Sequence, residues 1–439
     1  MSDYYNTIFD TYRRFDSIFD IYPDKLHMGA VYGYRKPDGT LLEFPCMLDV
    51  SRAVKDNKGR WTASGLGLKL AFVRYSDNLK RIAKRIDVKE AWIGDGFVES
   101  GNLKLVHENN AIEEVRFLDN ITSIGNNAFS GYTGLTSIEI PDGITSIGFN
   151  AFEFCTGLTS ITIPESVTKI GDQAFWNCTN LTDIKLPGSI RSIDHDYEFR
   201  MCPGLTNVII SEGLTTIGHA AFWCCYNLTS ITIPDSVTDI GESAFDGCSS
   251  LTHITIPEGV TKIEWWAFGH CKALTSITIP DGVTSIEDYA FAHCTGLSSI
   301  TIPDSVTKIG EGAFCGCVSL SKITIPNGIT KIKDYTFANC TSLTSITIPE
   351  GVTTIGWNEY DEMGWQEEKE RSGAFKGCTA LTEIRIPTSV TKIKDHTFQG
   401  CTSLADIYIN QPESTLLDNV DVPACCRIHW NSVTINKQS

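Results

Sequence analysis

The sequence lacks the long apolar segments of membrane proteins and of secretory precursors. No apolar run approaches the roughly 20 residues that a membrane-spanning helix needs. The N-terminus, MSDYYNTIFDTYRRFDSIFD, has no basic region followed by a continuous apolar stretch and a small-residue cleavage site. We therefore expect no membrane span. We expect a cytoplasmic location for the chain as written, and a surface or secreted location if an export signal was trimmed.

Motifs of the common enzymes are also missing. The sequence has no Gly-rich phosphate loop, no GxSxG, no HExxH and no paired CxxC. Its nine histidines are scattered, and His195, which stands between Asp194 and Asp196, is more typical of an acidic turn than of an acid–base site. We predict no catalytic residues, no cofactor and no metal ligands, and thus a protein that is not an enzyme.

Positive charge is scarce in most of the chain. The whole chain has 36 Lys and Arg and 53 Asp and Glu. Residues 1–111 hold 17 of the basic and 15 of the acidic residues, so residues 112–439 hold 19 basic and 38 acidic residues. An acidic surface of this kind repels phosphate backbones and acidic membrane surfaces, and no basic patch with interleaved aromatic residues interrupts it. We therefore exclude nucleic acid as a partner.

What the sequence does contain is a repeat of 23 residues. The leucine that opens LTSITIP returns at 135, 158, 181, 205, 228, 251, 274, 297, 320, 343, 381 and 404. The frame extends back to Ile112, and in weaker form to Val88. A repeat of this length cannot bury its apolar face alone, so neighbouring units must stack on one another.

One unit, residues 297–318, illustrates the expected coil. A short strand of β-branched residues opens the coil and ends at Pro303, which cannot donate a hydrogen bond to a neighbouring strand. A turn follows, then a second extended piece whose Val306 and Ile309 face inward. Ala313 and Phe314 are expected to close the coil through a helical turn.

The recurring LTSITIPxxVTxIGxxAFxxC of residues 112–411 resembles the leucine-rich repeats of the BspA-like surface-antigen family, found in bacteria of the mouth and gut and in some protozoan parasites. The resemblance implies a leucine-rich-repeat solenoid, a curved parallel β-sheet with short strands, turns and short helical turns on its convex side. For characterised relatives it implies adhesion to host or bacterial proteins. We divide the chain into an α+β N-terminal cap (1–86), the solenoid (87–411) and a C-terminal cap (412–439).

Eleven of the 16 cysteines occupy one position of the repeat, from Cys155 to Cys401. The spacing of stacked coils overlaps the range of a disulfide, but eleven cysteines in one line cannot all pair. We predict a buried column of small, soft side chains beside the Phe column. The motif CCRIHW at 425–430 fits a capping strand better than a metal site.

The ends of the chain depart from the repeat. Residues 4–19 place apolar side chains at helical spacing, which predicts an amphipathic helix that packs on the first coil or in its own small domain. A β-hairpin is predicted around Pro37, Asp38 and Gly39. Both segments belong to the predicted N-terminal cap.

Candidate binding residues are those that depart from the repeat. Outward positions of the opening strands are mostly Ser and Thr, but Glu383, Arg385 and Tyr408 near the C-terminal end are not. An insertion at 357–371 adds Trp357, Tyr360, Met363 and Trp365 among acidic residues. Such side chains either form binding hot spots or pack back on the coil. A second aromatic set on the closing segments is better explained by packing between coils: Phe149, Phe154, Trp176, Trp223, Trp265 and Trp266.

These patterns leave two main interpretations of function. The first is a binding or adhesion protein that recognises a host matrix or bacterial surface protein through the concave face and the inserted loop. The alternative is an intracellular scaffold or regulator that acts through its N-terminal module.

Overall fold

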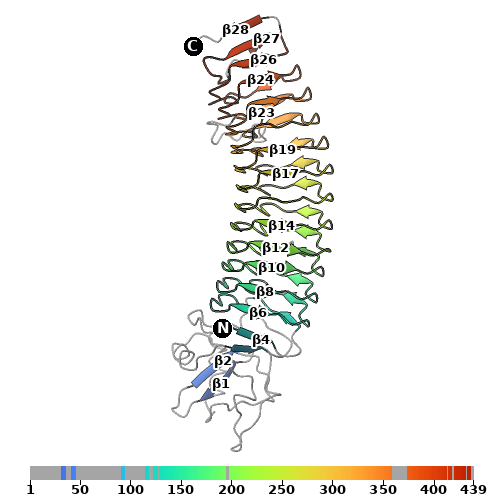
Figure 1. The fold of residues 1–439 in the computed structure, drawn as a ribbon, viewed down its shortest axis with the longest axis vertical. Helices are drawn as coiled ribbons and strands as arrows, with labels where there is room; N and C mark the ends of the chain where they lie inside the picture. The colour runs from blue at the N-terminus through green and yellow to red at the C-terminus, as the bar shows by residue number, and fades with distance from the viewer. Residues whose placement is uncertain are drawn as a thin grey trace, which may run out of the picture. The chain divides into compact units, whose positions relative to one another are not determined.

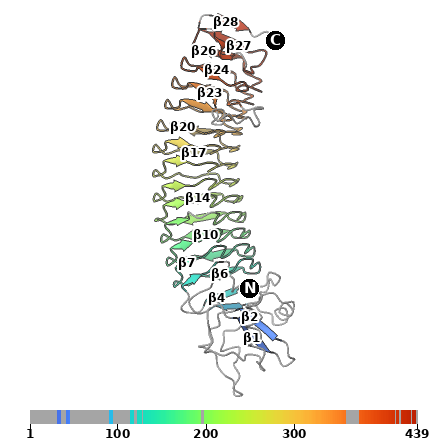
Figure 2. The ribbon, with the colours of Figure 1, turned by 180° about the vertical axis from the view of Figure 1, so that it is seen from behind.

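A computed structural model describes the backbone of residues 31–35, 41–45, 90–93, 114–117, 122–126, 128–193, 197–357, 373–412, 414–417, 420–431 and 433–436. Side chains are described from residue 122 to 431 of these ranges, except at 357 and 415. The chain divides into two compact units, Met1–Ser211 and Glu212–Ser439. In each unit the described repeats form stacked coils (Figures 1 and 2).

The first unit contains the predicted hairpin and the first coils. β1 (Val31–Arg35) pairs antiparallel with β2 (Leu41–Pro45); the predicted helix at 4–19 lies outside the described residues. The coils pair their opening strands in one parallel sheet: β3 (Glu90–Ile93), β4 (Glu114–Phe117), β6 (Ser137–Glu139), β8 (Ser160–Thr162), β10 (Asp183–Leu186) and β12 (Asn207–Ile210). Because β3 pairs with β4, the parallel sheet extends back to Glu90, within the weaker unit that opens at Val88. The second strands are β5 (Ser123–Ile124), β7 (Ser146–Ile147), β9 (Lys169–Ile170) and β11 (Ser192–Ile193).

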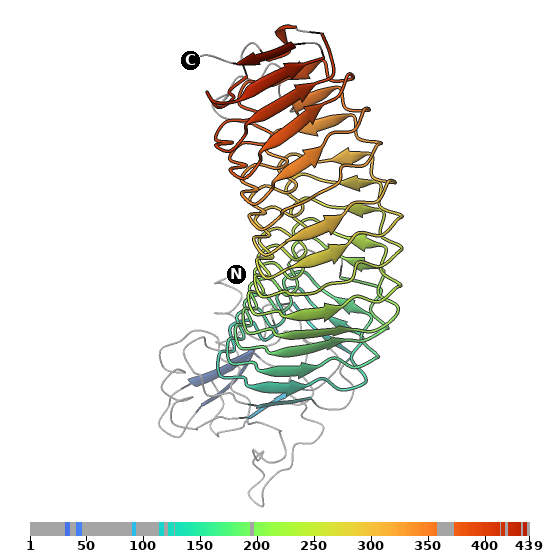
Figure 3. The same cartoon turned by 45° about the horizontal axis from the view of Figure 1, so that its top comes forward.

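The second unit continues the same pattern. Its opening strands are β14 (Ser230–Thr232), β17 (Ser276–Thr278), β19 (Ser299–Thr301), β22 (Ser345–Thr347), β24 (Glu383–Ile386) and β26 (Asp406–Ile409). Its second strands are β13 (Thr216–Ile217), β15 (Asp239–Ile240), β16 (Lys262–Ile263), β18 (Ser285–Ile286), β20 (Lys308–Ile309), β21 (Lys331–Lys333), β23 (Thr354–Trp357) and β25 (Lys392–Ile393). In Figure 3 the opening strands of successive coils form one row and the second strands form another, and turns join the two rows within each coil.

The C-terminal segment extends the opening-strand sheet. After a 3-10 turn (η3, Thr415–Leu417), β27 (Arg427–Trp430) pairs parallel with β26, and β28 (Val433–Asn436) then pairs antiparallel with β27. The strand predicted at CCRIHW therefore exists. It belongs to the same sheet as the repeats, although residues 412–426 do not follow the repeat frame.

A column of phenylalanines lies at the centre of each stack. Phe245, Phe268 and Phe291 are fully buried, and successive rings are 5.7 and 5.5 Å apart with planes within 7° of parallel. The leucine that opens each coil and the inward isoleucines are also buried, as is the residue before each Phe, which is alanine except at Glu198, Thr336 and Thr397. Each fully buried apolar side chain stabilises the stack by about 1.5–3 kcal/mol, so this core is the main source of stability.

The cysteine column is buried and reduced, as predicted, and it has a polar role that the sequence did not indicate. At ten of the eleven positions the thiol donates a weak hydrogen bond to the backbone carbonyl of the Phe one coil earlier, for example Cys294 Sγ to Phe268 O at 3.1 Å and Cys317 Sγ to Phe291 O at 3.2 Å. Alanine would fill part of the same space, but it would leave these carbonyls without this donor.

We predict that the column is chemically inert in the folded protein. Burial raises the pKa of Cys294 and of Cys401 to about 12, so neither thiol forms the reactive thiolate at neutral pH. Cys425 is exposed and serves as the control. With N-ethylmaleimide at pH 7.5, mass spectrometry should find Cys425 modified within minutes and Cys294 modified only in denaturant. Prompt modification of Cys294 in the native protein would contradict the packing described above.

The segments that close the coils are hydrogen-bonded turns rather than the helical turns expected. Two residues in most of the closing segments adopt left-handed backbone angles, for example Trp266 (φ 53°) and His270 (φ 54°). The backbone N–H of Phe268 donates to the carbonyl of Ala290 in the next coil at 2.9 Å. Alternate N–H groups of these segments therefore bind the coils to each other, and the N–H groups between them close the turns.

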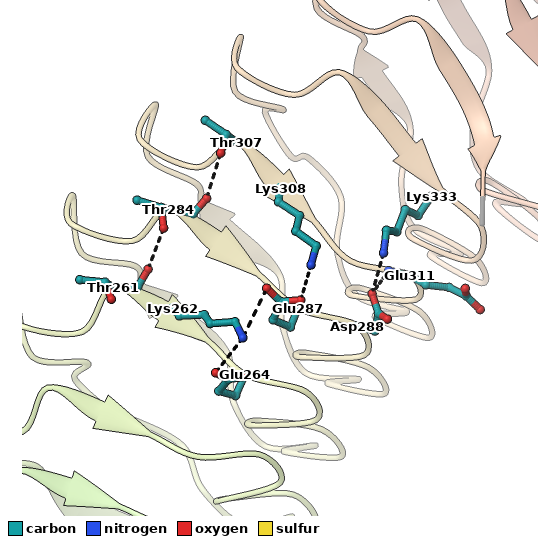
Figure 4. A network of polar contacts seen from close by, with 10 residues as sticks. All are labelled: Thr261, Lys262, Glu264, Thr284, Glu287, Asp288, Thr307, Lys308, Glu311 and Lys333. Atoms are coloured by element: carbon teal, nitrogen blue, oxygen red, sulfur yellow. Dashed lines mark hydrogen bonds and ion pairs between the residues drawn. The ribbon is translucent and has the colours of Figure 1, made fainter. Parts of the chain in front are cut away.

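A network of charged side chains links coils on the second-strand side of the second unit (Figure 4). Lys308 Nζ lies 2.7 Å from Glu287 Oε2, and Lys262 Nζ lies 3.8 Å from the other oxygen of the same carboxylate. Lys333 passes over one coil to reach Asp288 at 3.3 Å. Hydroxyl groups of Thr284 and Thr307 donate to the carbonyl of the preceding coil. These contacts tie neighbouring coils together at the surface.

We predict that Glu287 contributes to stability only while it is ionised. Burial alone would raise its pKa, but hydrogen bonds and charge from Lys308, with smaller contributions from Ser285 and Lys262, lower the pKa below its usual value. A lowered folded-state pKa gives stability that is present above the unfolded pKa of about 4.3 and is lost as pH falls through the folded pKa. Glu287→Gln should therefore cost about 1 kcal/mol at pH 7 and less at pH 3. Urea unfolding at both pH values tests this, and an equal cost at both would contradict it.

Candidate functional site

The outward side of the opening strands changes character near the C-terminal end of the second unit. In the earlier coils the outward side chains form two rows that are mostly Ser and Thr and that end at Ser345 and Thr347 on β22. The rows are interrupted at single coils by Glu139, Asp183, Lys185, Asn207, Ile209, His253 and Lys322. On β24, β26 and β27 the same two rows hold charged and aromatic residues. We call this group the C-terminal patch: Glu383, Arg385, Asp406, Tyr408, Arg427 and His429.

Strand register assigns these six side chains to two parallel rows. β24 pairs with β26 so that Glu383 is opposite Asp406 and Arg385 is opposite Tyr408. β26 pairs with β27 in the same register, which adds Arg427 to the first row and His429 to the second row. Inward residues of the same strands, such as Ile384 and Ile407, are buried. Because side chains alternate along a strand, the core fixes which residues face outward.

The second row is a stack of three planar groups. The Arg385 guanidinium lies 4.4 Å from the centre of the Tyr408 ring. On the other side, the Tyr408 and His429 rings are 4.6 Å apart with an angle of 14° between their planes. Cation–π and aromatic stacking each stabilise such an arrangement by about 0.5–1.5 kcal/mol. Arg385 and Tyr408 are therefore held in place before any partner arrives.

Asp406 joins the two rows. Its Oδ2 accepts a hydrogen bond from Arg427 Nη2 at 2.8 Å, and its Oδ1 lies 2.7 Å from His429 Nε2. Hydrogen bonds from Arg427 and His429 lower the pKa of Asp406 and keep it ionised. Glu383 makes a longer contact, 3.8 Å from its Oε1 to Arg385 Nη2. The patch is thus an ordered network rather than a set of separate surface charges.

The two arginines are the most accessible members of the network. The side chains of Arg385 and Arg427 are 63% and 55% exposed, against 15% for Asp406. An arrangement of fixed guanidinium groups beside an aromatic ring suits recognition of a polar partner, because Arg and Tyr are enriched at binding hot spots. Glu383, Arg385 and Tyr408, predicted separately from the sequence, lie together here.

Arg427 and His429 were not predicted from the sequence as partner-binding residues. Asp406 is a departure from the Ser/Thr rows, so the sequence held a signal for it. Arg427 and His429 follow a stretch that breaks the repeat frame, and only the pairing of β26 with β27 shows that they continue the same rows.

The inserted segment leaves the solenoid at a different place. Trp357 is the last residue of β23, a second strand, and the chain returns to the described coil at Gly373. The side chain of Trp357 and all of Tyr360, Met363 and Trp365 lie outside the described residues. The insertion therefore begins on the second strands, whereas the C-terminal patch is on the opening strands.

The second aromatic set packs between coils in part. Phe154 and Trp176 rings are 5.0 Å apart, and Trp223 Nε1 donates to Asp246 at 2.9 Å. Trp266 stacks on Tyr289 of the next coil at 4.8 Å. Phe149, Phe154 and Trp265 remain exposed. The interpretation as packing between coils therefore agrees with the contacts of Phe154, Trp176, Trp223 and Trp266, and not with the exposure of Phe149 and Trp265.

Two further features of the described residues bear on function. They contain no group of three or more His, Cys, Asp or Glu side chains arranged to hold a metal ion; His195 lies outside them. Among the same residues, no helix is both long enough and apolar enough to cross a membrane.

Stacked coils with a parallel sheet of opening strands define a leucine-rich-repeat solenoid. The chain belongs to the BspA-type leucine-rich-repeat family, because the model of that region matches residues 105–196, 195–278, 266–367 and 368–435. Among curated proteins, a sequence search found no match.

Solved structures of bacterial leucine-rich-repeat proteins resemble the chain. A leucine-rich repeat protein from Bacteroides ovatus is 25% identical with a TM-score of 0.64, over 94% of this chain and 100% of that one. A leucine rich cell surface protein from Faecalibacterium prausnitzii is 30% identical with a TM-score of 0.48, over 76% and 90%. The pneumococcal vaccine antigen PcpA is 21% identical with a TM-score of 0.51, over 78% and 84%.

Proposed function

We propose that the protein is a non-catalytic adhesion protein that binds a host matrix or bacterial surface protein through the C-terminal patch. The observation that carries this proposal is the row of Arg385, Tyr408 and His429, in which His429 is also hydrogen-bonded to Asp406 of the neighbouring row. A partner that meets side chains already fixed in place loses less conformational entropy on binding. The Ser/Thr rows of the earlier coils offer no such anchors.

The proposal is tested with three immobilised proteins and a panel of host matrix and bacterial surface proteins. These are the wild type, the double variant Arg385→Ala/Tyr408→Ala, and the control Ser299→Ala/Thr301→Ala, which changes the same two rows on β19. We expect the wild type and the control to retain the same partner, and the patch variant to lose at least about tenfold in affinity, since two hot-spot residues are removed. A partner retained equally by all three proteins would contradict the proposal.

The inserted residues Trp357, Tyr360, Met363 and Trp365 are proposed as a second contact, on the basis of the sequence. Aromatic and Met side chains in a solenoid loop are suitable anchors for a partner. The triple variant Tyr360→Ala/Met363→Ala/Trp365→Ala should weaken binding of the retained partner without changing the unfolding temperature. Unchanged affinity would remove the insertion from the binding surface.

A further inference from the structure

We infer that the C-terminal patch recognises an extended acidic peptide segment, in which two carboxylates four residues apart contact Arg385 and Arg427. This inference rests on the proposed function and specifies the chemistry of the partner. The proposed ligand is a segment of a protein and not an acidic polysaccharide.

The first observation is the way in which Arg385 is held. The carbon atom of its guanidinium lies over the Tyr408 ring, 4.4 Å from the ring centroid, and its side chain is 63% exposed. Its contact with the Glu383 carboxylate is long, at 3.8 Å. The contact with the ring uses the positive charge and leaves N–H groups of the guanidinium available for a two-pronged contact with a carboxylate.

The second observation is the way in which Asp406 is used. Both of its oxygens already have partners, Arg427 at 2.8 Å and His429 at 2.7 Å, and its side chain is only 15% exposed. The negative charge of Asp406 is therefore balanced by Arg427 and His429, and it repels an incoming carboxylate only weakly. Arg427 uses one nitrogen for Asp406 and is itself 55% exposed, so further N–H groups remain for a partner.

The third observation is the spacing of the two arginines. Arg385 lies on β24 in the second row and Arg427 lies on β27 in the first row, two strands and two residues away. With strands about 4.8 Å apart and about 3.3 Å per residue, their Cα atoms are about 12 Å from each other. An extended peptide spans about 13 Å in four residues, and side chains four residues apart lie on the same side of it. Carboxylates four residues apart therefore match the spacing of the two arginines along the sheet.

The acidity of the rest of the protein does not prevent this contact. The formal net charge is −17, but charges beyond about 8–10 Å are largely screened at physiological salt. Beside the patch, the outward side chains of β22 are the neutral Ser345 and Thr347. Local contact with the arginines therefore determines binding.

The test uses three fluorescein-labelled decapeptides of Gly and Ser, in fluorescence anisotropy with the full chain. The first has Glu at positions 3 and 7, the second has Glu at positions 3 and 4, and the third has Gln at positions 3 and 7. We expect the first peptide to bind about three- to tenfold more tightly than the third, the value for two exposed ion pairs, with the second in between. Arg385→Ala and Arg427→Ala should each reduce this preference, while Lys322→Ala, an exposed cation on an earlier coil, should leave it unchanged.

Arg385→Lys separates geometry from charge. Lysine keeps the positive charge but has no flat group to stack on Tyr408, so most of the preference for the spaced peptide should be lost. The inference is overturned if the peptides bind equally, or if Arg385→Ala leaves the preference intact. It is also overturned if labelled polygalacturonate depends on both arginines and the peptides do not.

The two proposals fail in different ways. If the panel yields a partner that Arg385→Ala/Tyr408→Ala loses, but the peptides show no preference, the binding surface stands and only the acidic segment is wrong. If the panel partner ignores the patch, the proposed function fails as well.

Discussion

Replacing Phe268 by Ala is expected to destabilise the second unit by about 3–5 kcal/mol. Phe268 is fully buried between Phe245 and Phe291, and its backbone carbonyl accepts a hydrogen bond from the thiol of Cys294. Backbone hydrogen bonds between the neighbouring coils fix their spacing, so the coils cannot collapse into the space that the ring leaves. Urea unfolding followed by circular dichroism measures the loss.

Trp265, three residues earlier in the same coil, provides the control. Its side chain is 48% exposed, so Trp265→Ala should change the free energy of unfolding by less than about 1 kcal/mol. If Phe268→Ala and Trp265→Ala cost the same, the phenylalanine column is not the main source of stability.

The second large effect is expected at Gly373, where the chain returns to the repeat after the insertion. A Cβ at this position would lie 1.9 Å from the carbonyl oxygen of His396 and 2.5 Å from its carbonyl carbon. Both atoms are backbone of the next coil, so relief of the clash requires the coils to move apart. We expect Gly373→Ala to cost about 3 kcal/mol and to lower the unfolding temperature by several degrees.

Gly282 is the matched glycine in a regular turn. A Cβ there would come no closer than 3.3 Å, to the carbonyl of Glu258. Gly282→Ala should therefore be neutral within about 1 kcal/mol. Equal unfolding temperatures for the two variants would show that the coil after the insertion is not packed as described.

The repeat made most of the fold predictable. A 23-residue frame with Leu, Ile, Val and Phe at fixed positions can bury those side chains only by stacking, and the structure places Leu297, Val306 and Phe314 in the core. Hydrogen bonding was less predictable. Nothing in the sequence indicates that Cys317 donates to Phe291 O, or that the closing segments bond to the next coil, because both contacts depend on how two coils meet.

The candidate site was predicted in part. Glu383, Arg385 and Tyr408 stand out because they interrupt rows of Ser and Thr. Arg427 and His429 on β27 do not stand out in the sequence, because residues 412–426 depart from the repeat frame. The register that places His429 beside Tyr408 therefore cannot be read from the repeat. When a site combines a repeat with a segment outside the repeat frame, only the strand pairing in the structure shows which residues are neighbours.

An alanine scan of outward positions on the opening strands is the most direct test of the central claim, that regular coils are scaffold and the C-terminal patch binds. Affinity for the partner retained by the wild type would be measured for single variants at Lys185, His253, Lys322, Arg385, Tyr408 and Arg427. We expect losses of at least about fivefold at the last three positions, and changes below about twofold at the first three. Losses that fall on the first three positions, or spread evenly over all six, would contradict the claim.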